Sequence, residues 1–218
     1  MGLQQASSKI ITAQQAVEIL KDGDTLVTGG FVGTGVAEEL MVALEQRFLK
    51  EKQPQDLTLV YAAGQGDSQD RGGNHIAYEG LIKRVIGGHW GLVPKMQKLA
   101  FEEKIEAYNL PQGVIAHMLR DIAGKRPATI STVGLDTFVD PRVEGGKINK
   151  KAQEDIVELF EIDGKECLRF KHFTPTVAFI RGTTADGRGN ITMEKEALKI
   201  ESMAIAAAVA NSGGTVIV

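Results

Sequence analysis

The sequence has a single cysteine, Cys167, and few aromatic residues, which make up 6% of its 218 positions. One cysteine cannot form an internal disulfide, so the composition favours a reducing compartment. The longest apolar stretch, residues 203–210, is too short and alanine-rich to span a membrane, and the N-terminal MGLQQASSK lacks a signal-peptide core. We therefore expect a cytoplasmic chain that is not bound to a membrane.

An excess of basic residues is also missing. The sequence has 25 basic and 28 acidic residues, giving a formal net charge of −3, whereas nucleic-acid-binding proteins usually carry a basic stripe. Hydrophobic residues make up 43%, which is enough to bury a sizeable core. No internal repeat, linker or low-complexity tract interrupts the chain, so we expect a single domain over residues 1–218 without a nucleic-acid partner.

Metal-ligand spacing is likewise absent from the sequence. None of the four histidines has a partner ligand at the short spacing of a zinc site; they are His75, His89, His117 and His172. The stretch GDSQDRGG at 66–73 resembles a calcium loop, but a glutamine and an arginine occupy ligand positions. Cys167 lies in an expected strand, where a buried, inert thiol is the better interpretation. We predict no metal site.

Short apolar strands alternate with amphipathic helices along the first 134 residues. The expected strands are 25–28, 57–61, 83–86, 105–108 and 128–134. One helix is expected directly after a capping box at Thr12, and three more are expected at 36–50, 94–101 and 112–124. This alternation is typical of βαβ units. It predicts an α/β fold with a mostly parallel sheet and helices on both faces.

The pattern changes in the last third of the chain. Residues 155–170 read as two strands joined by Asp163-Gly164, a strong signal for a small β-hairpin. A strand is expected at 177–182, a glycine-rich loop after it, and a long helix at 193–211. The final TVIV is as apolar as a buried strand of a parallel sheet.

Four glycines follow the first expected strand in DTLVTGGFVGTGVAEEL, residues 24–40. A P-loop would need Lys and Ser or Thr where Val36 and Ala37 stand, and a dinucleotide loop would need glycine at Glu38. Both nucleotide interpretations therefore fail. Two remain, which are a tight turn and a loop that lets a ligand or another chain approach the backbone.

A second long loop follows the strand at 57–61. Gln65, Asp67 and Arg71 come directly after the strand's carboxyl end, the edge at which open α/β sheets bind ligands. They either face a ligand or form a solvated Asp–Arg pair. Further on, GGHWGL places Trp90 in a glycine-flanked turn, where it is either a ligand platform or packs between elements.

Together these stretches resemble the first half of a family I CoA-transferase of the short-chain acetate/propionate branch. The family's signature is Asp-Gly, an apolar strand, Gly-Gly-Phe, three residues, Gly, one residue and Pro. It is matched by Asp22, Gly23, Gly29, Gly30, Phe31 and Gly35, whereas Thr28 and Ala37 depart from it. The segments 61–96, 105–142 and 179–194 resemble the same branch in family order, so the resemblance covers nearly the whole chain.

The resemblance implies an enzyme that moves CoA from a short-chain acyl-CoA to a free carboxylate through an acyl-glutamyl anhydride and a glutamyl-CoA thioester. The family's glutamate lies in a Glu-Asn-Gly-like segment of the second half. Glu79-Gly80 and Glu144-Gly145 do not match this context, so we assign no catalytic residue and expect this chain alone to be inactive.

The same resemblance implies coenzyme A as a substrate without a further cofactor. It also implies a second half, from the same polypeptide or a separate subunit, and a homo-oligomer. The substrate-binding residues it indicates are Gly29, Gly30, Phe31, Gly33 and Gly35 as a wall of the acyl site, with Gln65, Gln112 and Gly113 in the acid pocket. The alternatives are a phosphosugar isomerase, such as ribose-5-phosphate isomerase, and a non-catalytic ligand-sensing domain.

Overall fold

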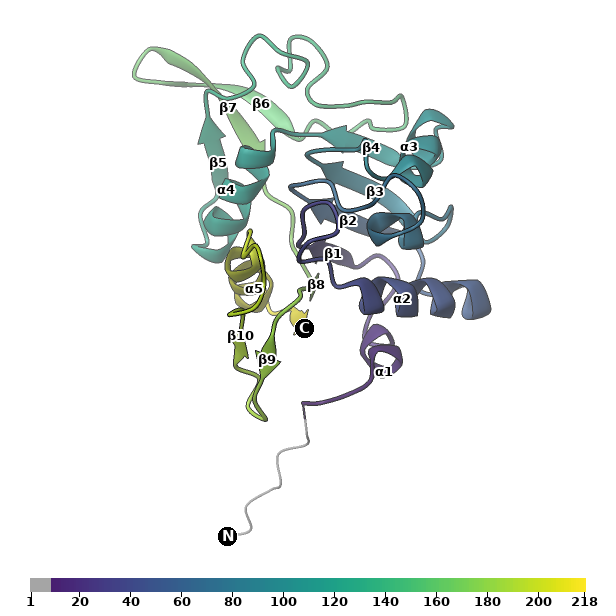
Figure 1. Ribbon diagram of the computed structural model, residues 1–218. Coiled ribbons are helices and arrows are strands. Elements are labelled where there is room, and N and C mark those ends of the chain that lie inside the picture. The colour runs from purple at the N-terminus through teal and green to yellow at the C-terminus, as the bar shows by residue number, and fades with distance from the viewer. Residues whose placement is uncertain (1–8) are drawn as a thin grey trace.

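The computed structural model describes residues 9–218 and centres on a six-stranded parallel sheet (Figure 1). The strand order is β11-β8-β1-β2-β3-β4, and the strands are β1 (Thr25–Thr28), β2 (Leu57–Tyr61), β3 (Ile82–Gly87), β4 (Glu106–Asn109), β8 (Val177–Phe179) and β11 (Thr215–Ile217). Val27 pairs with Val60 on one side and with Ala178 on the other. The α/β fold with a mostly parallel sheet is therefore confirmed. Met1–Ser8, most of the stretch without a signal-peptide core, lies outside the described residues.

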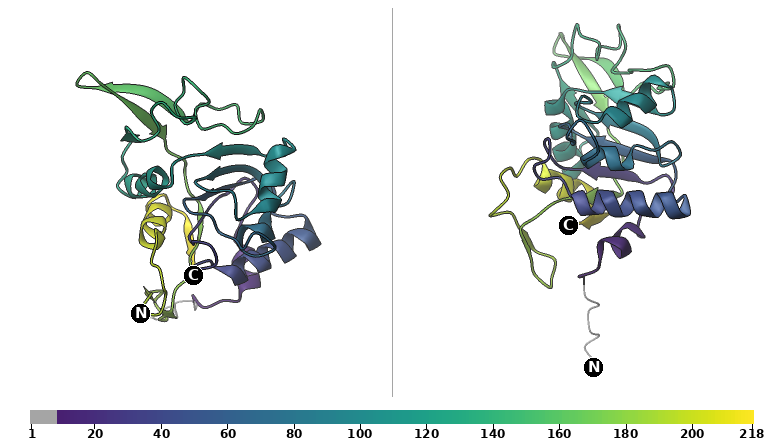
Figure 2. Two further views of the ribbon diagram at one scale, coloured as in Figure 1. Left: turned by 45° about the horizontal axis from the view of Figure 1, so that its top comes forward. Right: turned by 45° about the vertical axis from the view of Figure 1, so that its right-hand side comes forward.

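Helices cover both faces of this sheet (Figures 1 and 2). One buried cluster joins the sheet to α1 (Ala13–Val17), α2 (Glu38–Glu51), the 3-10 helix η1 (Gly72–Ile76) and α3 (Pro94–Phe101). The other face packs against α4 (Gln112–Ala123) and α5 (Ser202–Asn211) in a second cluster. The sheet is thus the middle of three layers, which leaves its two ends for loops.

Local sequence explains where these helices begin. The Thr12 hydroxyl accepts a hydrogen bond from the Gln15 backbone N–H, and the Gln15 side chain accepts one from Thr12, which completes the expected capping box. Pro94 opens α3, a position at which its missing N–H costs nothing. In α2, Leu40, Leu44 and Phe48 recur on one face and are buried.

A second, three-stranded antiparallel sheet has the order β5-β7-β6, from β5 (Ala128–Ser131), β6 (Val157–Ile162) and β7 (Lys165–Lys171). The expected Asp163-Gly164 hairpin is confirmed, and both residues have the positive φ that its turn requires. The expectation that 128–134 continues the βαβ series is wrong. Ile130 pairs with Arg169 instead, because α4 carries the chain past the edge of the main sheet.

The long helix expected at 193–211 is also wrong in its first half, since α5 begins only at Ser202. The preceding segment is held against the hairpin of β9 (Thr184–Ala185) and β10 (Ile191–Thr192). There Thr184 donates to Glu194, Arg181 pairs with Glu196, and Ile200 has a φ of 44°. Those polar contacts and the left-handed residue replace a helical path.

Candidate functional site at the carboxyl edge of the sheet

The glycine loop, which we define as Gly29–Gly35, projects from the carboxyl end of β1. Phe31 and Thr34 exchange backbone hydrogen bonds of 2.8 and 2.9 Å, which closes a tight turn. At its tip the Val32 N–H donates to the Gly64 carbonyl at 2.8 Å, and the Val32 carbonyl accepts from Gly66 at 2.9 Å. The loop therefore rests on the segment that follows β2.

Val32 has an unusual backbone conformation for its residue type. Its φ is 56°, in the left-handed region that a β-branched residue rarely adopts. Two backbone hydrogen bonds hold it there, and the residue is still 40% exposed. Strain of this kind concentrates at functional sites, so the tip of the glycine loop is the first place to look for one.

The glycines of this loop differ in whether backbone conformation or packing requires a glycine at their positions. Gly30 has a φ of 146°, and a Cβ there would lie 2.5 Å from Val36 Cγ2. Gly35 has a φ of 71° and faces Ile200. Gly33 is exposed, has no such φ, and a Cβ on it would meet nothing within 4 Å. Nothing within the described chain requires a glycine at position 33, which leaves its bare backbone available to something outside it.

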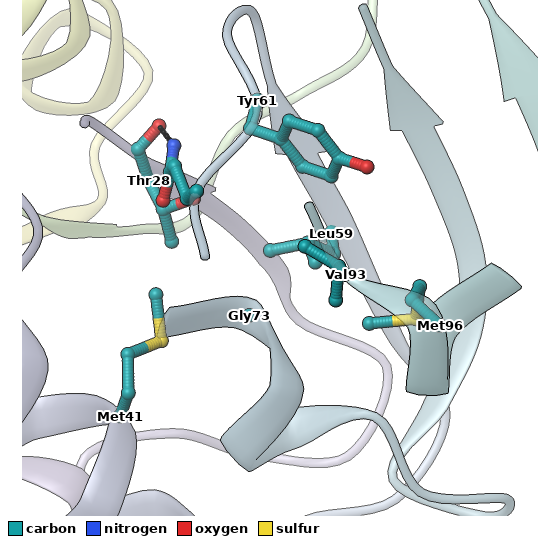
Figure 3. Close-up of a pocket in the computed structure, with 8 residues that line it drawn as sticks. Thr28, Met41, Leu59, Tyr61, Gly73, Val93 and Met96 are labelled. Carbon is teal, nitrogen blue, oxygen red and sulfur yellow. Dashed lines mark hydrogen bonds between the residues drawn. The ribbon is translucent and has the colours of Figure 1, made fainter. Parts of the chain in front are cut away.

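Gln65 points inward from the next loop. Its side-chain amide donates to the Thr28 carbonyl at 3.0 Å, and the residue is 3% exposed. It borders a cavity of about 10 Å³ (Figure 3), which is lined by Thr28, Met41, Leu59, Tyr61, Gln65, Gly73, Val93 and Met96. Such a volume holds about one water molecule, so this cavity cannot take an acyl group.

The Asp67 side chain holds the backbone of its own loop in place through hydrogen bonds. Its carboxylate accepts hydrogen bonds from the backbone N–H groups of Gln69, Asp70 and Arg71 at 2.9, 3.0 and 3.1 Å. The Arg71 and Gln69 amides lower the pKa of the Asp67 carboxyl, with a smaller contribution from Asp70. Asp67 and Arg71 are both exposed at the carboxyl edge, where we expected them either to face a ligand or to form a solvated pair.

A cluster of hydrogen-bonded polar side chains, which was not predicted from the sequence, connects this loop to α2. Glu38 accepts from the Gly72 N–H at 3.0 Å and lies 3.1 Å from His75 Nε2. Glu45 lies 2.6 Å from His75 Nδ1 and accepts from the Tyr78 hydroxyl at 2.6 Å. The bond to Glu45 raises the pKa of Tyr78 to about 12. These contacts join residues more than 25 positions apart, so no local pattern signals them.

Gln112 and Gly113 begin α4, beside the carboxyl end of β3. The Gln112 side chain packs over Gly88, where a Cβ would lie 2.7 Å from Gln112 Cγ and 2.2 Å from the Ala62 carbonyl oxygen. A Cβ at Gly113 would meet nothing within 4 Å. Since β1, β2 and β3 are neighbours, the expected site residues follow one edge of the sheet, and the side chain of Gln65 is turned into the core.

The remaining chemistry-bearing residues do not extend this site. Within residues 9–218 no three His, Cys, Asp or Glu side chains gather as a metal would require, and no helix has the length and apolar character to cross a membrane. Cys167 is buried, and Glu79 pairs with Lys104 at 3.2 Å. An open cleft of about 470 Å³, bordered by Asp22, Asp56, Lys83 and Arg84, lies at the opposite edge of the sheet.

Comparisons with known proteins agree with this geometry. A profile of the Coenzyme A transferase family matches residues 10–214. The chain is 43% identical over 209 residues to Acetate CoA-transferase YdiF of Escherichia coli (strain K12), covering 95% of this chain and 39% of the relative. It is 44% identical over 211 residues to Caffeate CoA-transferase of Acetobacterium woodii, covering 97% of this chain and 40% of the relative.

The crystal structure of the acyl-CoA transferase YdiF apoenzyme from Escherichia coli O157:H7 superimposes with a TM-score of 0.94 at 42% identity. The match covers 96% of this chain and 41% of that chain. The chain thus spans about two fifths of the length of these relatives. From its sequence, its fold and the loops at its carboxyl edge, the chain belongs to the coenzyme A transferase family.

Proposed function

We propose that this chain is the first half of an enzyme that moves CoA between a short-chain acyl-CoA and a free carboxylate of the acetate/propionate class. The observation that carries the proposal is the exposed tip of the glycine loop. Gly33 there has room for a side chain that it lacks, next to a strained and exposed Val32. Similarity to acetate and caffeate CoA-transferases supports the reaction class.

The proposed reaction passes through a glutamate outside this chain. Its carboxylate attacks the thioester carbonyl, which breaks the C–S bond, releases CoA thiolate and leaves an acyl-glutamyl anhydride. The thiolate then attacks the glutamyl carbonyl, giving a glutamyl-CoA thioester and releasing the first acid as its carboxylate. The acceptor carboxylate repeats these two steps in reverse order. No oxidant, reductant or further cofactor is consumed.

In this proposal the chain supplies one wall of the reaction site. The glycine loop allows the acyl group to approach the backbone closely, because Gly33 has no Cβ. Gln112 and Gly113 border the acid pocket from the start of α4, and Gln65 supports the loop from below through Thr28. The second half, in the same polypeptide or a separate subunit, closes the site, and the assembled enzyme is a cytoplasmic homo-oligomer.

The test is an exchange assay on the complete enzyme, with the second half in the same polypeptide or added as its natural subunit. We expect transfer of CoA from propionyl-CoA to acetate. Mass spectrometry after incubation with propionyl-CoA should find a glutamyl-CoA adduct on a glutamate outside residues 1–218. The absence of exchange, or an adduct on a glutamate within these residues, would overturn the proposal.

A further inference from the structure

The imidazole ring of His89 packs against two glycines, Gly64 and Gly91. A Cβ at Gly64 would lie 2.5 Å from His89 Nδ1 and 3.2 Å from Cγ, and one at Gly91 would lie 3.1 Å from Cε1. Neither glycine has a φ in the left-handed region, so backbone geometry does not demand glycine at either position. Both make room for the ring, which holds the imidazole in one place.

The imidazole ring of His89 has no hydrogen-bond partner within residues 9–218. His75 lies between two carboxylates and His172 contacts the Thr129 hydroxyl, whereas neither nitrogen of His89 makes a hydrogen bond and the residue is exposed. The adjacent Trp90 is buried in the core and anchors the turn. A well-positioned side chain with free hydrogen-bonding groups is what a ligand contact requires.

His89 also lies beside the proposed reaction site. Gly64, on which the ring rests, accepts the 2.8 Å hydrogen bond from the Val32 N–H at the tip of the glycine loop. On its other side, the preceding residue Gly88 packs under Gln112. The imidazole therefore lies between the glycine loop and the start of α4, along the same edge of the sheet.

We propose that His89 is a binding residue that donates a hydrogen bond from its imidazole to an anionic oxygen of a substrate. This inference rests on the proposed function. The two substrates offer such an oxygen as the carboxylate of the free acid or as a phosphate of CoA. A hydrogen bond to a charged group contributes about 1.5–3 kcal/mol, so its loss weakens binding about ten-fold or more.

The test compares His89→Phe with wild type in the complete enzyme. Phenylalanine keeps a flat ring over Gly64 and Gly91 but has no nitrogen, so it separates hydrogen bonding from packing. His117→Phe is the matched control, because His117 is exposed on α4 and makes no hydrogen bond within the described part of the chain. A second variant, His89→Gln, restores a donor and should recover part of the binding.

We expect His89→Phe to raise one KM about ten-fold while the melting temperature and the KM values of His117→Phe stay close to wild type. A rise confined to acetate identifies the carboxylate as the ligand. A rise for acetyl-CoA that disappears with acetyl-pantetheine, which lacks the nucleotide phosphates, identifies a phosphate. Unchanged KM values for both substrates in an active enzyme overturn the role of His89 alone, whereas a wild-type enzyme without exchange overturns the proposed function.

Discussion

A substitution at Gly33 distinguishes two reasons for glycine in the loop after β1, which are the packing of the loop itself and the close approach of a ligand. Because its Cβ would meet nothing within 4 Å among residues 9–218 and its φ is not left-handed, Gly33→Val should leave stability within about 0.5 kcal/mol of wild type. In the complete enzyme the added side chain would displace the acyl group, so we expect turnover to fall about a hundred-fold. Exchange kinetics and urea unfolding of the same variant measure the two effects.

Gly187 serves as the control for this experiment. Gly187→Val places the same side chain in similarly open space within the β9–β10 hairpin, and should change neither stability nor turnover. Gly35→Val is not equivalent, because its φ of 71° and the contact with Ile200 strain any side chain. Near-normal turnover by a well-folded Gly33→Val enzyme would remove the glycine loop from the reaction site.

Gln65 acts on the same loop from inside the protein. Gln65→Ala leaves the buried end of β1 without its amide donor, so we expect a loss of about 1–3 kcal/mol in unfolding free energy. The exposed Gln69, whose side chain makes no hydrogen bond within the described residues, provides a Gln→Ala control with an expected change below about 0.5 kcal/mol. Equal stability of the two variants in urea would contradict a structural role for the Gln65 amide.

The role of Gln65 in the acid pocket stays a separate prediction. If the pocket lies directly above it, Gln65→Ala should shift preference among short carboxylates more than affinity for CoA. The measurement is kcat/KM for several acids at saturating acyl-CoA. An equal loss for every acid would assign the whole effect to the supporting bond with Thr28.

At the scale of the elements, a partly buried network of polar side chains joins α4, β5 and the end of β7. The Thr129 hydroxyl of β5 donates to Asp121 of α4 at 2.7 Å and lies 2.9 Å from Nε2 of His172, the residue that follows β7. Asp121 also pairs with Arg126 at 3.0 Å. This network of hydrogen bonds attaches the antiparallel sheet to the three-layer body. Because the network includes the titratable His172, we predict that the attachment is sensitive to pH.

Burial lowers the pKa of His172 from its ordinary 6.5, against the attraction of Asp121 and together with repulsion from Arg169. The unfolded chain therefore takes up this proton first as the pH falls, so the stabilisation is present above about pH 6.5 and is lost below it. We expect wild type to lose more unfolding free energy than His172→Gln between about pH 7.5 and about pH 5.5. Parallel losses in urea titrations of the two proteins would contradict this.

Periodicity predicted the elements better than their partners. The helix at 94–101 and the hairpin at Asp163-Gly164 were predictable because proline and glycine set their ends locally. The strand at 128–131 has the same apolar character as the strands before it, and only its pairing with β7, some 40 residues later, places it in another sheet. For the same reason the sequence located Gln65 at the carboxyl edge but could not show that its amide turns inward.

At the scale of the whole molecule, the exposed residues that packing within the chain does not explain lie at the carboxyl edge of the sheet. The exposed Phe31 and Val32, the open position at Gly33, and His89, which has no hydrogen-bond partner within the described residues, all lie there. Ser202, the first residue of α5, lies next to Gly29, and the residue after it, Met203, is 86% exposed. Apolar side chains around an open loop are typical of a surface that another polypeptide covers.

This surface leads to the prediction that residues 1–218 alone catalyse no CoA transfer. No glutamate in the chain matches the nucleophile context of the family, and an uncovered carboxyl edge leaves water around any bound thioester, which weakens every electrostatic contribution to catalysis. We expect no exchange between propionyl-CoA and acetate by the purified chain, and activity only after the second half is added. The added half should also protect Phe31 and Met203 from solvent, which hydrogen exchange of the neighbouring amides can detect. Robust turnover by the chain alone would place the nucleophile within it and refute the division of the site between two halves.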